Sequence, residues 1–407
     1  MSNMKANINQ QSSQKDFEAL KIIVGGICGM VVVMGIGRFA FTPILPLMQR
    51  DLGVSNTLAG WLAGLNYLGY LLGAVICTIT PQLIRSRTVA SSALLLSIAT
   101  TFLMSLTLSE FWWSVLRLVG GFVSAVMFVI ISAEVGGTLI KRGHGHWVGA
   151  IYGGIGLGIA LSGLIVFQLD KIGGWDAAWA GMGIIAVIAA VFGCYGIIWG
   201  QSGIYKAEAP SGLAKPTGNL GRIWILNTAY FLEGMGYIVT ATFIVAIIAA
   251  TPGLEAFASY SWVFVGLAAI PSTIFWPYLA RRIGNKKALL AAYALQAAGI
   301  MISVRAVSVI EVMFAALSFG GTFLGIVALT LSEGNMRLGN DGGRAAAILT
   351  VSFSIGQMIG PIIAGKLADQ QNSFTLPLSL AAFCVILGGI LTAIDRDFAT
   401  EKIKKGG

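Results

Sequence analysis

Arg38 lies inside an apolar stretch, residues 21–48, that is otherwise typical of a helix crossing a membrane. A guanidinium at the centre of a bilayer costs about 2.5–3.5 kcal/mol on insertion scales, so we expect it to face a protein interior or a water-filled cavity. Its planar group of five donors suits the oxygens of a carboxylate or a phosphate. Arg38 is therefore a candidate for binding an anionic ligand, and a structural ion pair is the alternative.

The elements around Arg38 must be membrane helices, because the composition excludes a soluble protein. The 407 residues are 56% hydrophobic and 11% charged, whereas soluble domains are about one-quarter charged. A helix of about 20 apolar residues spans a bilayer. On this criterion the sequence predicts twelve transmembrane helices, at 21–47, 57–80, 87–107, 112–139, 147–168, 177–199, 221–250, 256–278, 287–306, 310–333, 344–367 and 374–394.

The predicted fold class is an all-α membrane protein whose twelve helices form two pseudo-symmetric halves of six. A polar segment with Pro, Gly and Ser separates the two sets of helices. The predicted organisation is an N-terminal tail at 1–20, a first half at 21–199, a linker at 200–220, a second half at 221–394 and a C-terminal tail at 395–407.

The 26 Lys and Arg residues indicate how the chain faces the membrane. Short cytoplasmic loops normally hold the excess of basic residues, and most of these 26 fall in such loops if the N-terminus is inside. We therefore expect both termini, the linker and the two tails in the cytoplasm. The net charge of +9 then follows from topology, and no nucleic-acid partner is expected.

The two predicted halves share weak internal matches in the same order, as parallel repeats of a transporter do. The sequence GIGR at 35–38 corresponds to GMGY at 234–237, in the first and seventh predicted helices. The sequence SAE ending at Glu134 corresponds to LSE ending at Glu333, in the fourth and tenth. This shared order indicates duplication.

These features resemble the major facilitator superfamily of secondary transporters. The sequence ARRIGNKK at 280–287 is similar to the basic loop signature of that family, with Ala280 where the signature has Asp. The sequence RLVGG at 117–121 resembles its fourth-helix motif, and GRFAFTP at 37–43 with the segment 60–70 resembles the YbfB/YjiJ group. The resemblance implies alternating access in a bacterial inner membrane.

The family fold implies a central cavity surrounded by the first, fourth, seventh and tenth helices. We expect its substrate-binding residues to be Arg38 with its neighbours, the deep aromatic residues, and polar side chains that need a partner when buried. Packing between helices is the alternative for each aromatic residue. The candidate substrate-binding residues are Arg38, Phe39, Phe41, Thr42, Asn66, Tyr67, Tyr70, Tyr152, Tyr237, Thr240, Trp262, Phe353 and Gln357.

Glu233 is the candidate for proton coupling. It precedes Tyr237 by one helical turn in the seventh helix and can neutralise Arg38 across the cavity. Binding of a substrate at Arg38 would then alter the proton affinity of Glu233. The alternative is a hydrogen-bonding group between helices.

Five further charged residues are assigned gating or structural roles. Glu134 and Glu333 precede the basic residues Lys141 and Arg337 and can latch one end of the bundle. Arg117 can reach a carbonyl or a carboxylate on a neighbouring helix, with a proton relay as the alternative. The family loop signature adds two gating candidates, Arg281 and Arg282.

The sequence predicts a monomeric, proton-coupled transporter of a small organic anion, acting as a symporter or antiporter. One alternative is a proton-coupled exporter of neutral or cationic amphiphiles, with Glu233 binding the cation. A second is a receptor or scaffold that transports nothing. No cofactor or metal ion is expected, and no nucleophile with a base or metal cluster indicates an enzyme.

Overall fold

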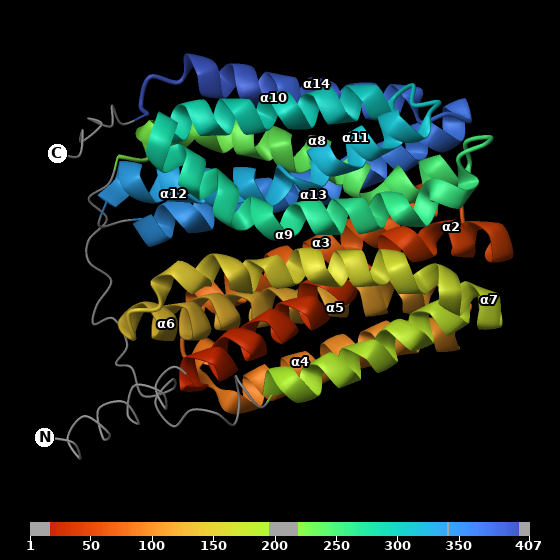
Figure 1. Ribbon diagram of the computed structural model, residues 1–407, viewed down its shortest axis with the longest axis horizontal. Coiled ribbons are helices and arrows are strands. Elements are labelled where there is room, and N and C mark those ends of the chain that lie inside the picture. Colours follow the sequence, from red (N-terminus) through yellow and green to blue (C-terminus); the bar gives the residue numbers. More distant parts are fainter. Residues whose placement is uncertain (1–16, 195–218, 340–341, 399–407) are drawn as a thin grey trace, which may run out of the picture.

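The computed structural model describes residues 17–194, 219–339 and 342–398, which form one bundle of long helices (Figure 1). Most of the predicted tails and of the predicted linker at 200–220 lies outside the described residues. The first helical segment, Phe17–Leu52, includes a π-helix, η1 (Val31–Ile36), and α2 (Phe41–Leu52). The later helices are α3 (Asn56–Ile79), α4 (Arg87–Leu103), α5 (Glu110–Ile130), a second π-helix η4 (Ile131–Gly136), α6 (Gly137–Lys141), α7 (Val148–Cys194), α8 (Trp224–Ala249), α9 (Ala258–Ile283), α10 (Asn285–Ser303), α11 (Val309–Gly320), α12 (Phe323–Leu338), α13 (Gly342–Gln371) and α14 (Thr375–Ile394).

Ten helical segments within the described residues are long and apolar enough to cross a membrane. One of them is α7, which covers the predicted helices at 147–168 and 177–199 and breaks at Gly174 (φ 81°, ψ −155°). Glycine adopts this backbone conformation without the steric cost of a side chain. The α10 helix is not among the ten, because Asn285, Lys286, Lys287 and Gln296 lower its mean hydropathy.

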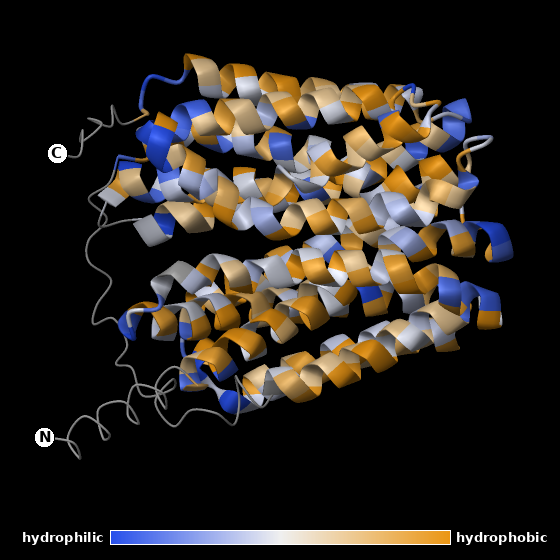
Figure 2. Ribbon diagram, in the orientation of Figure 1, coloured by the Kyte–Doolittle hydropathy of each residue, from blue (hydrophilic) through white to orange (hydrophobic). Residues whose placement is uncertain are grey.

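Large apolar side chains cover the outside of the bundle. Leu95, Ile184, Phe192 and Phe383 are all at least half exposed, and the apolar residues run along the helices while hydrophilic residues gather at the two ends (Figure 2). A soluble monomer rarely exposes apolar surface on this scale. The outer surface is therefore suited to contact with lipid, as expected of an integral membrane protein.

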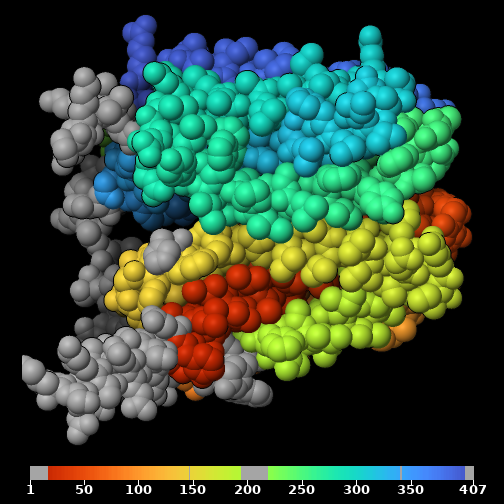
Figure 3. Space-filling model, in the orientation of Figure 1, coloured from red at the N-terminus to blue at the C-terminus, as the bar shows by residue number. Residues whose placement is uncertain are grey.

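Two pairs of helices join early and late parts of the chain through small residues. On α3, a Cβ at Gly60 would collide with the carbonyl oxygen of Pro361 on α13. On α9, a Cβ at Gly266 would collide with the backbone of α7, which lies against α9 on the face shown in Figure 3. Small residues allow membrane helices to approach closely, so these two contacts bring the elements of the candidate site together.

Candidate substrate cavity

A cavity of about 160 Å³ lies in the middle of the bundle, between the first helical segment and helices α3, α5, α7, α8, α12 and α13. Its lining residues on α12 run from Phe323 to Leu331, so it extends toward the end of the bundle that holds Arg337. We call this end the Arg337 end. Six of the predicted substrate-binding residues line the cavity: Arg38, Phe39, Tyr70, Tyr237, Phe353 and Gln357.

Arg38 provides the only charged side chain among the residues that line this cavity. It is 4% exposed and lies in a turn, residues 37–40, that interrupts the first helical segment after η1. Its guanidinium carbon lies 4.5 Å from the ring centroid of Tyr67 and 4.3 Å from that of Tyr70. Its Nε and Nη2 atoms are buried and have no hydrogen-bond partner in the described part of the chain. The cavity thus holds a fixed cation with unused donors.

Arg117 supports the turn that carries Arg38. Its Nη1 and Nη2 atoms donate to the carbonyl oxygens of Gly37 and Arg38, each over 3.5 Å. Asn66 donates to the carbonyl oxygen of Arg117 over 2.9 Å. Arg117 thus contacts carbonyl groups of the first helical segment, and Asn66 contacts this support instead of lining the cavity.

Aromatic rings in near-parallel orientation form one wall of the cavity. The ring centroids of Tyr230 and Phe353 are 4.2 Å apart, those of Phe353 and Tyr237 5.3 Å apart, and those of Tyr237 and Phe323 6.0 Å apart. The amide of Gln357 donates to the hydroxyl of Tyr237. The sequence analysis missed Tyr230 and Phe323, whose only signal was an aromatic residue in the seventh and tenth predicted helices.

The remaining predicted substrate-binding residues lie beside the cavity or away from it. Tyr67 packs on Arg38 from outside the lining, and the Trp262 ring lies 6.5 Å from the Phe39 ring. Tyr152 packs on Phe128, while Thr240 lines a separate, small apolar pocket. Two others make contacts between helices: Phe41 stacks on Trp179, and the Thr42 hydroxyl donates to the carbonyl oxygen of Ala241 over 2.6 Å.

Glu233 is 1% exposed and lies on α8 outside the cavity lining. Its Oε1 atom accepts a hydrogen bond of 2.5 Å from Gln296 on α10, and the Oε1 atom of Gln296 accepts one of 2.9 Å from Thr322. Its Oε2 atom has no partner in the described residues. The structure does not bring Glu233 and Arg38 together as an ion pair. The signal in the sequence that could have located these hydrogen bonds is Gln296, a polar residue in a predicted helix.

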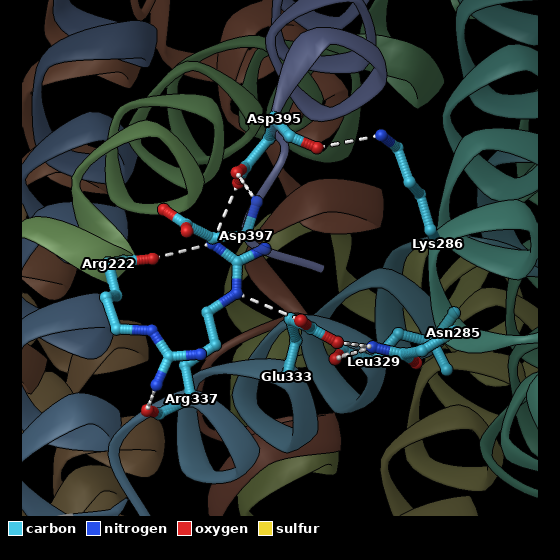
Figure 4. Close-up of polar contacts among 8 residues, drawn as sticks. All are labelled: Arg222, Asn285, Lys286, Leu329, Glu333, Arg337, Asp395 and Asp397. Carbon is cyan, nitrogen blue, oxygen red and sulfur yellow. Dashed lines mark hydrogen bonds and ion pairs between the residues drawn. The ribbon is translucent and has the colours of Figure 1, made fainter. Parts of the chain in front are cut away.

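A buried network of charges lies at the Arg337 end (Figure 4). The Arg337 guanidinium pairs with Glu333 over 2.9 Å and with Asp395 over 2.8 Å, and these three side chains are at most 1% exposed. Asn285 donates to Glu333 over 2.8 Å, and Lys286 donates to the carbonyl oxygen of Asp395 over 2.8 Å. The predicted contact of Glu333 with Arg337 is present. The network joins α10, α12 and the end of α14.

The other three gating candidates also lie toward this end. Glu134 is within electrostatic range of Arg85 and Lys141. Arg281 and Arg282 are exposed near the end of α9, where the Arg282 guanidinium lies 5.3 Å from the ring centroid of Tyr278. Of these three, only Glu134 is buried.

At the opposite end of the bundle, the carboxylate of Asp369 on α13 caps the start of α3. The backbone N–H groups of Asn56 and Thr57 donate to its two oxygens over 3.0 and 2.7 Å. Gln49 donates to Asn56 over 2.8 Å. We call this the Asp369 end. A carboxylate is stabilised at a helix N-terminus by free N–H groups and the helix dipole, so this contact holds α3 and α13 together beyond the cavity.

Comparisons with known proteins agree with this architecture. Residues 30–393 match the family described as "Uncharacterised MFS-type transporter YbfB". No curated protein matches the chain. Among solved structures, the nucleoside transporter NupG is similar with a TM-score of 0.70 and 13% identity, covering 92% of this chain and 97% of that one. The structure of a point mutant of NupG is similar with a TM-score of 0.73 and 11% identity, and the match covers 92% of this chain and 99% of that one. At these identities the likeness concerns the fold alone.

Proposed function

Because this chain belongs to the family of MFS-type transporters described by YbfB, it is a secondary transporter and not an enzyme, and we propose that its cargo is a small organic anion. The observation that carries this proposal is the buried guanidinium of Arg38, which lines the cavity and whose Nε and Nη2 atoms have no partner among the described residues. Buried donors without partners cost free energy, and a carboxylate of the cargo would satisfy them.

The proposed transport cycle is alternating access between two halves of six helices, twelve in all. The cavity reaches toward the Arg337 end, while Asp369 and the N-terminus of α3 join the two halves at the other end. If the basic loops are cytoplasmic, this is the inward-facing conformation of a monomer with both termini in the cytoplasm. The membrane proposed from the family resemblance is a bacterial inner membrane.

The proposed coupling ion is the proton, and Glu233 is the proposed carrier. Its single partner among the described residues is the neutral amide of Gln296, and its second oxygen is unpartnered, so a proton can be accepted there without breaking an ion pair. Because Glu233 lies outside the cavity lining, proton and substrate would bind at separate sites.

Export of cationic amphiphiles is the less favoured alternative. A site for cations needs an acidic or aromatic partner, and the cavity has aromatic residues but no acidic residue among those that line it. Arg38 would repel a cation. A nucleoside, the cargo named for the structural neighbour, brings no anionic group to Arg38.

Flux into liposomes that contain the purified protein tests the proposal. We expect counterflow of radiolabelled carboxylates for the unaltered chain and a loss of at least tenfold for Arg38→Lys, since an ammonium does not reproduce the planar fork. Arg305→Lys, at an exposed position, is the matched control. Carboxylate flux that survives Arg38→Lys would contradict the role of Arg38, and flux of cations alone would favour the exporter. No flux of any solute would favour a receptor or scaffold.

A further inference from the structure

The charge of Arg38 is held in a fixed place and orientation. Its guanidinium lies over the rings of both Tyr67 and Tyr70, and two cation–π contacts of this kind restrict the movement of the group. No carboxylate of the described chain pairs with it, and Nε and Nη2 are free to donate. A ligand carboxylate can therefore pair with Arg38 without displacing a carboxylate of the protein.

The rest of the cavity is lined mainly by aromatic and aliphatic side chains. The rings of Phe353, Tyr237 and Phe323 lie within 8° of parallel in the two adjoining pairs. The amide nitrogen of Gln357 donates one hydrogen bond to the Tyr237 hydroxyl. Aromatic rings prefer other aromatic rings in stacked or edge-to-face geometry over aliphatic groups of the same area. The wall thus favours a planar ring over a flexible chain or a sugar.

The size of the cavity suits a ligand of one ring. Pockets for drug-sized ligands usually measure about 300–1,000 Å³, and this cavity measures about 160 Å³. An apolar cavity of about 150 Å³ in another protein holds one benzene molecule.

We infer that the cavity binds a monocyclic aromatic carboxylate, with its carboxylate on Arg38 and its ring against Phe353 and Tyr237. This inference rests on the proposed function, because it assumes that Arg38 binds an organic anion. It adds that the ring wall selects aromatic acids over aliphatic acids of the same size and charge.

The test compares three ligands of nearly equal size on the purified, unaltered protein by isothermal titration calorimetry. Benzoate has the ring and the charge, cyclohexanecarboxylate has the charge without a planar ring, and benzamide has the ring without the charge. We expect benzoate to bind about three- to tenfold more tightly than cyclohexanecarboxylate, the range given by aromatic pairs. Benzamide should bind much more weakly than both.

Two leucine variants locate the selectivity. Phe353→Leu should remove the preference for benzoate over cyclohexanecarboxylate while leaving the affinity for cyclohexanecarboxylate within twofold. Phe319→Leu is the matched control, because Phe319 stacks on Tyr237 and Phe323 but does not line the cavity. It should keep the preference.

The outcomes separate this inference from the proposed function. Equal affinity for benzoate and cyclohexanecarboxylate, with both lost in Arg38→Ala, would overturn the aromatic selectivity and leave the organic-anion proposal standing. Absence of binding by either acid, or binding that Arg38→Ala does not change, would overturn both. If a variant fails to fold, the comparison of the three ligands on the unaltered chain still decides the question.

Discussion

Glu233 is buried between α8 and α10, where its two carboxylate oxygens have different surroundings. Oε1 accepts from Gln296, and Oε2 has no partner among the described residues. An uncompensated buried charge costs several kcal/mol, so a change of protonation at this residue is a large local event. The chain of hydrogen bonds to Thr322 leads to the junction of α11 and α12, next to Phe323 of the cavity wall. This path can link proton binding to the cavity without a direct contact with Arg38.

We predict that Glu233→Gln uncouples transport from protons. The amide resembles the protonated carboxyl in shape but cannot release a proton. Uptake driven by an imposed pH gradient should fall to the level without a gradient, while counterflow of the same solute should persist. Glu110→Gln at an exposed position is the control. Undiminished gradient-driven uptake in Glu233→Gln would exclude Glu233 as the proton carrier.

The candidate residues could be predicted from the sequence in part only. Arg38 was recognisable because a charged residue within an apolar helix is energetically costly and therefore usually has a function. Glu233 was recognisable for the same reason, but the helix that its side chain faces was not. Residues 233 and 237 lie only about 40° apart around a helix, so their spacing suggests one common face. In the structure, however, Glu233 contacts α10 while Tyr237 lines the cavity. Sequence spacing cannot decide which neighbouring helix each one faces.

At the scale of helices, the close packing of α3 on α13 depends on glycines, because a larger residue at these positions would collide with the facing helix. A Cβ at Gly365 would collide with the carbonyl oxygen of Asn56, whereas a Cβ at Gly343, also on α13, would meet no atom within 4 Å. The sequence showed the richness in glycine but could not show which glycines lie at a helix contact.

We predict opposite effects for one substitution at these two positions. Gly365→Ala should destabilise the protein by about 1–3 kcal/mol through overpacking. Gly343→Ala should be neutral or stabilise it by up to about 1 kcal/mol, because alanine favours the helix. The melting temperature in detergent measures both. An equal effect of the two substitutions would show that the contact of α3 with α13 does not limit stability.

The charge network at the Arg337 end also connects helices, and its residues do not line the cavity. We predict that Arg337→Gln destabilises the protein by about 3–5 kcal/mol, because it leaves the buried carboxylates of Glu333 and Asp395 without their cation. Arg50→Gln, which removes an exposed ion pair with Asp170, should cost less than about 1 kcal/mol. Melting temperatures test the difference. A small loss in Arg337→Gln would contradict the view that Glu333 and Asp395 depend on Arg337 for charge compensation.

At the scale of the whole molecule, the cavity and the contacts at the Asp369 end describe one conformation of the proposed transport cycle. The first helical segment and α3 meet α8 and α13 at this end through Thr42, Asn56 and Asp369. The sequence could predict the fold class and the family, since hydropathy and loop motifs carry them. It could not predict the conformation, because two states of one sequence differ by only a few kcal/mol.

We predict that Asp369→Asn shifts the protein toward a state that is open at the Asp369 end. An anion at a helix N-terminus contributes about 0.3–1 kcal/mol, so the population of the open state should rise about two- to fivefold. Spin labels at positions 53 and 370, with their distance distribution measured by electron paramagnetic resonance, should show more long distances. Asp176→Asn, at an exposed position, is the control. An unchanged distribution would mean that Asp369 does not hold this end closed.

The π-helix η1 sets the direction of Arg38 by the number of residues before it. Gly37 and Phe39 donate to carbonyl oxygens five residues earlier, at Val32 and Met34. Loss of one residue from Val31–Ile36 would restore the ordinary helical pattern and rotate Arg38 by about 100° relative to the preceding turns. Its side chain would then leave the cavity, although the hydropathy of the helix would hardly change. We therefore expect the deletion of a single codon here to remove the proposed anion contact of Arg38, although every neighbouring codon stays the same.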